Sequence, residues 1–185
     1  NEIINGDIHT ANQKAAGLES RDQAKTFIYA LIYGAGDAKL GSVVKGSRQD
    51  GKRLRQHFFD NNPSFKTLRD KVSRAAKKGY LKGLDGRKIF IRSEHAALNS
   101  LLQGGGAVIM KRGLALLDSL IKLNTYDAKF VANIHDEWQM EVREDIATNV
   151  GQLAVDCIKT AGNYYNLRCP MDGEYKVGRN WSETH

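Results

Sequence analysis

The sequence has little of what staples a chain or anchors it in a membrane. Its 185 residues include two prolines and two cysteines, Cys157 and Cys169. Two cysteines cannot form a disulfide framework and have no metal-ligand spacing, so we expect inert, partly buried thiols in a reducing compartment. No apolar run reaches the 18 or more residues that would cross a bilayer. These absences exclude a disulfide-stapled secreted scaffold and a membrane-spanning helix.

The composition is that of an ordinary globular protein with a basic surplus. Hydrophobic residues make up 41% and charged residues 26% of the chain, which excludes wholesale disorder. Lysine and arginine (28) exceed aspartate and glutamate (21), which gives a net charge of +7 and a pI near 9.4. This surplus modestly favours a polyanionic partner such as nucleic acid.

Periodicity and turn signals predict an α+β fold. Ser20, followed three residues later by Gln23, indicates a capping box that starts a helix ending before Gly34. Asp85-Gly86 between apolar flanks indicates a β-hairpin, and three consecutive glycines at 104–106 divide a helical stretch into one helix or two. The expected helices are 8–18, 20–33, 37–44, 49–59, 64–78, 93–123 and 146–164, with hairpins in 80–91 and 129–142 and a last strand at 174–177.

The most informative segment is the helix predicted at 20–33. Arg21, Lys25, Tyr29 and Tyr33 recur every four residues, so they share one helix face that spans about 18 Å. Two cations at the N-terminal end suit the phosphates of a nucleoside triphosphate, and two rings suit its sugar and base. The alternative is an amphipathic helix whose tyrosines pack inward while its cations face water.

Two further segments carry candidate chemistry. His135-Asp136-Glu137 lies on a tight turn between apolar strands, where adjacent acids suit Mg²⁺ held by carboxylates and substrate phosphates; the alternative is a solvated acidic loop. Asn99 and Gln103 lie four apart before the glycines, so both amides can donate to minor-groove acceptors. The alternative there is a helix break with two ordinary surface amides.

Several blocks occurring in one order resemble a known family. The pattern R-x3-K-x3-Y-x3-Y-G over 21–34, followed by His-Asp-Glu at 135–137, resembles motifs B and C of family A (pol I type) DNA polymerases. Further blocks at 6–10, 83–87 and 95–103 resemble the replicative polymerases of tailed phages. The resemblance implies a right-hand polymerase: a palm segment at 1–18, helical fingers at 19–92 and, at 93–185, a palm with the catalytic hairpin.

The resemblance also implies roles for the candidate residues on the nucleotide side. Arg21 and Lys25 would hold the triphosphate of an incoming dNTP, with His9 adding a phosphate contact and Lys25 acting as proton donor to the leaving pyrophosphate. Tyr29 would lie by the sugar and base, and Tyr33 would pack on the template side of the nascent pair.

On the DNA side the resemblance implies contacts with primer-template DNA and two Mg²⁺ ions. Asp136 would bind metal as a catalytic carboxylate, with Glu137 assisting. The minor-groove contacts would come from Asn99 and Gln103, and further DNA contacts from His135, near the primer terminus, and Arg92.

One part of the family pattern is missing from the sequence. The second metal-binding aspartate, expected in an Asp-Tyr/Phe-Ser-x-x-Glu motif, is not found, and 185 residues leave no room for a thumb or exonuclease. We therefore expect a C-terminal portion, inactive alone, whose partner is an upstream polymerase portion carrying those parts.

Exposed palm edges would favour self-association, and a phage-encoded chain would work in the host cytoplasm. The alternatives are a non-catalytic DNA- or nucleotide-binding module and a nuclease-like Mg²⁺ enzyme using Asp136 and Glu137.

Overall fold

The computed structural model describes residues 6–184, and the chain divides into two compact units, residues 1–102 and 103–185. Residues 1–5 and 185, which fall in the two predicted palm segments, lie outside the described residues. Each unit is described by itself. No described helix is both long enough and apolar enough to span a membrane.

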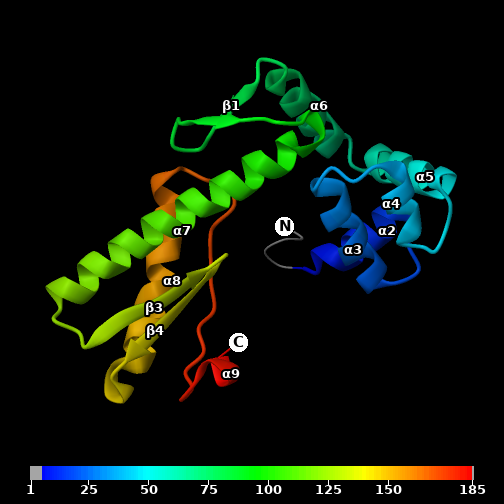
Figure 1. The fold of residues 1–185 in the computed structure, drawn as a ribbon. Coiled ribbons are helices and arrows are strands. Elements are labelled where there is room, and N and C mark those ends of the chain that lie inside the picture. Colours follow the sequence, from blue (N-terminus) through cyan, green and yellow to red (C-terminus); the bar gives the residue numbers. More distant parts are fainter. Residues whose placement is uncertain (1–5, 185) are drawn as a thin grey trace. The chain divides into compact units, whose positions relative to one another are not determined.

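The first unit is mainly helical, as the sequence predicts. Its described residues form five α-helices, α2 to α6, followed by a small antiparallel hairpin and a 3-10 turn (Figure 1). Their bounds are α2 Ile8–Ala16, α3 Arg21–Ile32, α4 Asp37–Ser42, α5 Arg48–Asn61, α6 Pro63–Ala76, β1 Tyr80–Lys82, β2 Lys88–Phe90 and η1 Glu94–Ala96.

Helix α3 packs its apolar stripe into the core of this unit. Ala24, Phe27, Ile28 and Leu31 follow the i, i+3, i+4, i+7 spacing of one helix face, and all four are buried. They join residues of α4 and α5, including Leu40, Phe58, whose ring is edge-on to that of Phe27, and Phe59, whose ring is tilted against that of Phe58. The helix is therefore fixed on one side by packing, and its other side faces solvent.

The capping prediction for α3 is correct in its first half and wrong in its second. The Ser20 hydroxyl accepts a hydrogen bond from the Gln23 backbone N–H at 3.2 Å, as a helix N-cap does. The Gln23 side chain instead accepts from the backbone N–H of Glu19 at 3.2 Å, one residue before the cap. The Gln23 side chain therefore pairs with the residue before the cap and not with the Ser20 backbone, so the capping box is incomplete.

A second small core lies beneath the β1–β2 hairpin. Val72 and Ala76 of α6, Leu81 of β1, and Ala97 and Leu98 at the start of α7 are buried together. Gly86 has φ 85°, a left-handed conformation that glycine adopts without strain, which explains the turn at Asp85-Gly86. The predicted hairpin in 80–91 is confirmed.

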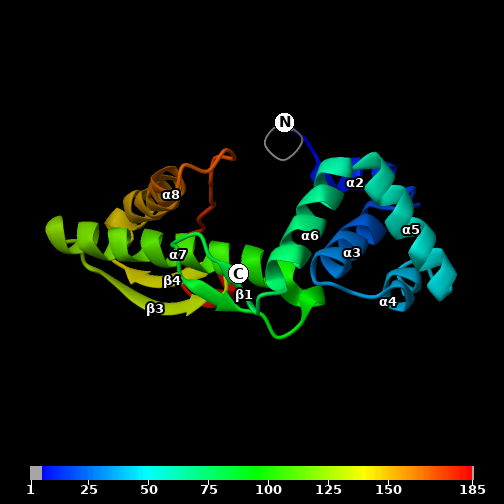
Figure 2. The same ribbon diagram turned by 90° about the horizontal axis from the view of Figure 1, so that it is seen from above.

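The stretch at 93–123 forms one long helix. After η1, helix α7 Ala97–Leu123 continues for 27 residues through all three glycines (Figures 1 and 2). A glycine in a helix interior costs about 1 kcal/mol relative to alanine, and the packing of this long helix outweighs that penalty. The helix break offered as an alternative does not occur.

The second unit builds a two-stranded sheet against two helices. Strands β3 Ala128–Ile134 and β4 Glu137–Val142 pair antiparallel, and α8 Ala147–Tyr164 follows the short 3-10 turn η2 Glu144–Ile146. Leu117 and Ile121 of α7 and Cys157 of α8 form the buried core, against which Phe130 and Trp138 pack. The hairpin predicted at 129–142 is thereby confirmed and anchored by its apolar face.

Two expectations for this unit are wrong. Residues 174–177 form no strand, because neither described strand of the unit pairs with them; they run past α8 as an irregular segment before the short helix α9 Trp181–Thr184 (Figure 1). Of the two thiols, Cys157 is buried but Cys169 is exposed. Burial raises the pKa of the Cys157 thiol to about 11, so that thiol is inert.

Candidate functional site

The solvent face of α3 carries all four side chains that the sequence places in one row. Arg21 and Lys25 are exposed, and Tyr29 and Tyr33 are 45% and 52% exposed. The tyrosine rings lie 6.3 Å apart, centre to centre, at 28°, which is a stacked arrangement. The alternative of inward-packed tyrosines is wrong, because the helix buries its Ala24, Phe27, Ile28, Leu31 stripe instead.

Arg21 is held in place by a residue that sequence reasoning did not connect with it. The Asp7 carboxylate accepts a hydrogen bond from Arg21 Nε at 2.6 Å and also caps α2 by accepting from the backbone N–H groups of His9 and Thr10. The Arg21 guanidinium beside it, together with Thr10, holds the pKa of the Asp7 carboxyl well below its usual range. Asp7 in turn raises the pKa of Arg21. The ion pair ties α2 to the N-terminal end of α3.

His9 extends the aromatic part of this face. Its ring centre lies 6.2 Å from that of Tyr29 at 55°, and its Nδ1 is buried without a hydrogen-bond partner among the described residues. His9, Arg21 and Tyr29 are thereby brought together, as the sequence predicts for a nucleotide site. A buried polar atom without a hydrogen-bond partner is uncommon in folded proteins.

The acidic turn lies at the tip of the β3–β4 hairpin. Ile134 pairs with Glu137, so His135 and Asp136 form the two-residue loop, and both are exposed. His135 has φ 54°, a left-handed conformation that is uncommon outside glycine and costs free energy. The turn therefore presents the Asp136 carboxylate to solvent from a tightly bent backbone.

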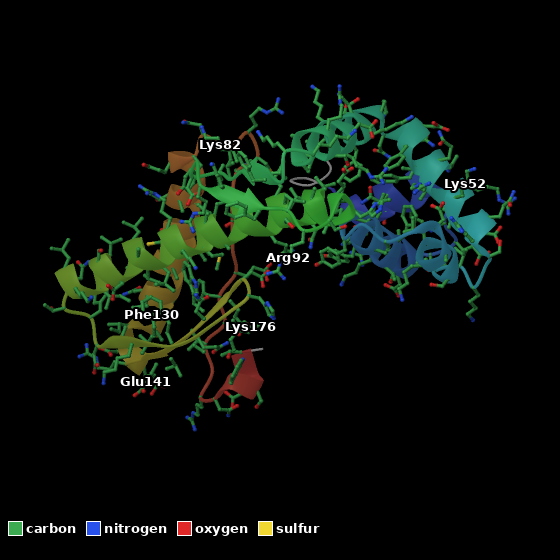
Figure 3. All side chains as sticks on the ribbon, turned by 45° about the horizontal axis from the view of Figure 1, so that its top comes forward. Lys52, Lys82, Arg92, Phe130, Glu141 and Lys176 are labelled. Atoms are coloured by element: carbon green, nitrogen blue, oxygen red, sulfur yellow. The ribbon has the colours of Figure 1, made fainter. Side chains whose placement is uncertain are left out.

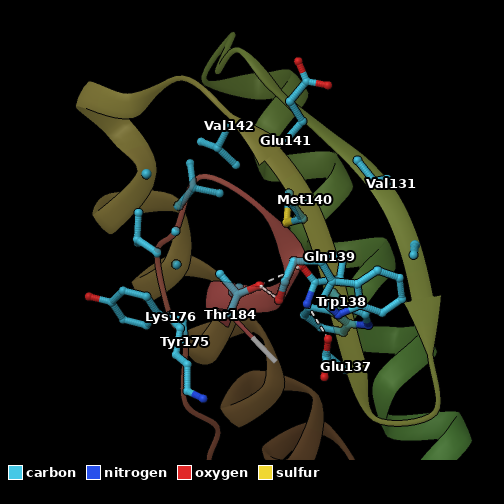
Figure 4. Close-up of a pocket in the computed structure, with 18 of the residues that line it drawn as sticks. Val131, Glu137, Trp138, Gln139, Met140, Glu141, Val142, Tyr175, Lys176 and Thr184 are labelled. Atoms are coloured by element: carbon cyan, nitrogen blue, oxygen red, sulfur yellow. Dashed lines mark hydrogen bonds between the residues drawn. The ribbon is translucent and has the colours of Figure 1, made fainter.

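Glu137 is oriented by a short chain of hydrogen bonds. Gln139 Nε2 donates to Glu137 Oε1, and the Gln139 side-chain oxygen Oε1 accepts from the Thr184 hydroxyl at 3.3 Å. Thr184 belongs to α9, so the end of the described chain positions the second acid of the motif (Figure 4). Sequence reasoning did not find this link, because the residues lie 45 positions apart.

A groove of about 1270 Å³ lies beside this turn within the second unit. Strand β4 contributes Trp138, Gln139 and Met140 to its lining, and the segment after α8 contributes Tyr175 and Lys176 (Figure 4). Asp136 and Glu137 also line the groove. The Trp138 Nε1 is buried without a hydrogen-bond partner among residues 6–184.

The remaining candidate residues lie along or just before α7. Asn99 Oδ1 is buried and unpaired among the described residues, while Gln103 and Arg92 are exposed. A Cβ atom added at Gly105 or Gly106 would meet no heavy atom within 4 Å. Because no side chain fills this part of the helix surface, another backbone can approach it closely.

The described residues fit a magnesium ion only in part. No three His, Cys, Asp or Glu side chains between residues 6 and 184 are grouped so as to hold a metal ion. Mg²⁺, however, is commonly held by one or two carboxylates together with waters and substrate phosphates. Exposed Asp136, with Glu137 next to it, suits one side of such a site.

The chain is similar to known DNA polymerases over nearly its whole length. Residues 4–183 match the model of the family described as DNA polymerase family A. The chain is 43% identical over 190 residues to a DNA-directed DNA polymerase of Escherichia phage Phieco32, covering 99% of this chain and 31% of that protein. It is 40% identical over 206 residues to the DNA-directed DNA polymerase of Escherichia phage T7, covering 100% of this chain and 29% of that one.

A solved structure agrees as well. The POL domain of Pol1 from M. smegmatis, in complex with DNA primer-template and dNTP, matches with a TM-score of 0.76 and 26% identity, over 84% of this chain and 31% of that one. The chain belongs to DNA polymerase family A. The predicted α+β polymerase fold is confirmed, and the chain spans 29% to 31% of the length of the two phage relatives.

Proposed function

We propose that this chain supplies the fingers and part of the palm of a template-directed DNA polymerase, which transfers a nucleotide from a dNTP to a primer 3′-hydroxyl. The single observation that carries the proposal is the outward face of α3. Its two cations and two stacked rings are exposed together, although burying the tyrosines would remove more apolar surface from water. A surface that keeps rings beside cations matches the layout of a nucleotide.

Each residue of that face has a distinct task in the proposal. Arg21 and Lys25 bind the triphosphate, and the ion pair with Asp7 holds the Arg21 side chain at the N-terminal end of α3. Tyr29 packs against the sugar and base with His9 beside it, and Tyr33 continues the ring stack toward the template side. In this proposal Lys25 also gives a proton to the departing pyrophosphate.

On the hairpin, Asp136 is the proposed metal-binding carboxylate. Glu137 assists from a position fixed by Gln139, and His135 contacts DNA near the primer terminus. Two bound Mg²⁺ ions would activate the primer hydroxyl and stabilise the charge on the phosphates. Gln103 and Asn99 contact the minor groove next to the open helix surface at Gly105, and Arg92 contacts the DNA backbone.

The isolated chain is proposed to be inactive. Among the described residues, Asp136 belongs to no group of three possible metal ligands, and two closely spaced ions need shared ligands from more than one carboxylate. The upstream portion of the polymerase is proposed to bring the missing aspartate. Val131, Val177 and Trp181 are 68%, 57% and 48% exposed, and such apolar surface suits a covering partner. Without that partner, the outer edges of β3 and β4 favour self-association.

Primer extension tests this proposal. We expect no extension by the chain alone and metal-dependent extension after addition of an upstream portion that contains the Asp-Tyr/Phe-Ser-x-x-Glu motif. Strong extension by the chain alone would contradict the account of the site. Reconstitution that leaves activity intact after Asp136→Ala would favour the second candidate, a DNA- or nucleotide-binding module without catalytic chemistry. That residues 6–184 contain no complete metal-ligand group also favours this candidate. In either case the work of a phage-encoded chain would be done in the host cytoplasm.

A further inference from the structure

The positive charge of the chain is concentrated in one stretch of the first unit. Residues 63–92, which form α6 and the β1–β2 hairpin, contain ten lysines and arginines and two aspartates. Their net charge of +8 exceeds the +7 of the whole chain. Among the described residues, one ion pair lies in this stretch, between Arg87 Nε and Asp85 Oδ2 at 2.5 Å. Most of this charge is therefore left for a partner.

The register of the hairpin places aromatic rings and lysines on one face. Tyr80 pairs with Phe90, Leu81 with Ile89, and Lys82 with Lys88. Alternate residues of a strand point to opposite faces, and Leu81 is buried in the core beneath. Tyr80, Phe90 and the two paired lysines consequently share the outer face, which we name the hairpin platform; Figure 3 labels Lys82.

Two features of the hairpin platform are unfavourable in the free protein. Phe90 is 76% exposed, so a large apolar ring faces water. Lys82 and Lys88 stand directly opposite each other, and like charges in that position destabilise a strand pair. Both features become favourable when a ligand supplies a flat apolar surface and negative charge together.

Two lysines, Lys88 of the hairpin platform and Lys78 just before β1, already lie over the Tyr80 ring. Lys78 Nζ is 4.8 Å and Lys88 Nζ is 4.7 Å from the ring centre of Tyr80. The charges are thus held beside the place where a base would stack, rather than spread over a distant surface. Single-stranded nucleic acid offers bases for stacking and phosphates at each step, whereas the bases of a duplex are already stacked.

We propose that the hairpin platform is a binding surface for single-stranded nucleic acid. An unpaired base stacks on Phe90 beside Tyr80, and Lys82, Lys88 and Lys78 contact the phosphates on either side. The proposal relies on the proposed polymerase function only for the class of partner, because every contact in it lies outside α3 and the acidic turn. An acidic protein segment would satisfy the lysines but would leave Phe90 without a role.

Binding of a fluorescent 16-nucleotide oligo-dT by the 185-residue chain tests the proposal, by anisotropy with EDTA and without dNTP. We expect Phe90→Leu, which keeps apolar bulk but removes the ring, to weaken binding about tenfold. The plot of log K against log salt has a negative slope, and we expect Lys82→Gln with Lys88→Gln to make it less steep by about 1.4. The matched control, Lys39→Gln with Lys52→Gln, changes the same charge on exposed residues of α4 and α5 and should leave the slope unchanged.

The other outcomes overturn the proposal. If the platform variants bind oligo-dT no more weakly than the control, the strand is bound elsewhere. If a poly-glutamate peptide competes as well as unlabelled oligo-dT and Phe90→Leu has no effect, the partner is an acidic protein. Lys25→Ala should leave oligo-dT binding by the chain intact but lower dNTP use by the reconstituted polymerase. If dNTP use falls while the platform variants bind oligo-dT normally, this proposal fails and the polymerase assignment stands. Unchanged circular dichroism shows that the variants fold.

Discussion

The face of α3 and the acidic turn at 135–137 differ in how many supporting contacts each receives from its own unit. The helix face is supported on all sides by its unit: Ser20 caps it, Asp7 holds Arg21, a buried stripe fixes it from behind, and Tyr29 and Tyr33 stack on each other. The turn presents an exposed Asp136 on a strained backbone, with no metal-ligand group complete among residues 6–184. A nucleotide surface can be preorganised by one helix, whereas a metal site needs ligands from several segments.

The largest expected effect concerns the turn. In the polymerase reconstituted with its upstream portion, Asp136→Ala should lower kcat by about a thousandfold or more, because a lost metal ligand removes several kcal/mol of transition-state stabilisation. Single-turnover primer extension measures it. Glu141→Gln, which removes an exposed acid from the adjoining strand β4, is the matched control and should change kcat little. Equal losses in both variants would show that the turn has no special role.

The framework beneath the helix face is tested by stability. Gly51→Ala would place a Cβ 1.9 Å from the Asp37 backbone oxygen and 2.5 Å from Gly41 N, so we expect a loss of about 3 kcal/mol where α4 and α5 meet. Both tryptophans, Trp138 and Trp181, lie in the second unit and report its unfolding. Urea titration should shift the circular-dichroism transition and leave the tryptophan transition in place.

Gly105→Ala is the control for that experiment, and we expect it to raise the free energy of unfolding instead of lowering it. A Cβ at Gly105 meets no described atom within 4 Å, so the helix should gain about 1 kcal/mol. If the glycine keeps α7 open to duplex DNA, the same variant should bind duplex more weakly despite its higher stability. A stability loss at Gly105 would mean that this helix surface is not open.

On the helix face, Lys25→Ala should raise KM for dNTP by about 10- to 100-fold, the range for losing a hydrogen bond to a charged group. Duplex affinity should change little, because it comes from many phosphate contacts. Steady-state kinetics and a duplex-binding titration measure the two quantities, with Lys39→Ala, an exposed lysine of α4, as control. Parallel losses in both quantities would count against a triphosphate ligand.

The smallest effect concerns the Asp7–Arg21 ion pair. The hydrogen bond from Arg21 lowers the pKa of the Asp7 carboxyl below the ordinary value of 3.8, so the carboxylate stays charged to lower pH in the folded chain than in the unfolded chain. A depressed carboxyl pKa stabilises the fold above the unfolded pKa, and this contribution is lost as the pH falls through the folded pKa. Carbon NMR of Asp7 measures the titration, and Arg21→Gln should return the pKa toward 3.8. No change in that variant would exclude the ion pair.

How much was predictable from sequence follows from the range of each interaction. The start of α3, the shared face of Arg21, Lys25, Tyr29 and Tyr33, and both hairpins depend on neighbours within a few residues, and all are present. The glycines at 104–106 mislead, because local propensity predicts a possible break while the packing of α7 maintains the helix. The strand predicted at 174–177 fails because a strand exists only with a partner beside it.

By itself, the sequence determined which side chains share a helix face, where the tight turns lie and to which family the chain belongs, since local periodicity and the order of motifs are properties of the chain alone. Tertiary structure decided which face of α3 is buried, that Arg21 pairs with Asp7, that Glu137 is held through Gln139 by Thr184, and that Cys169 is exposed. Those outcomes join residues far apart in sequence, and only packing brings such residues within reach of one another.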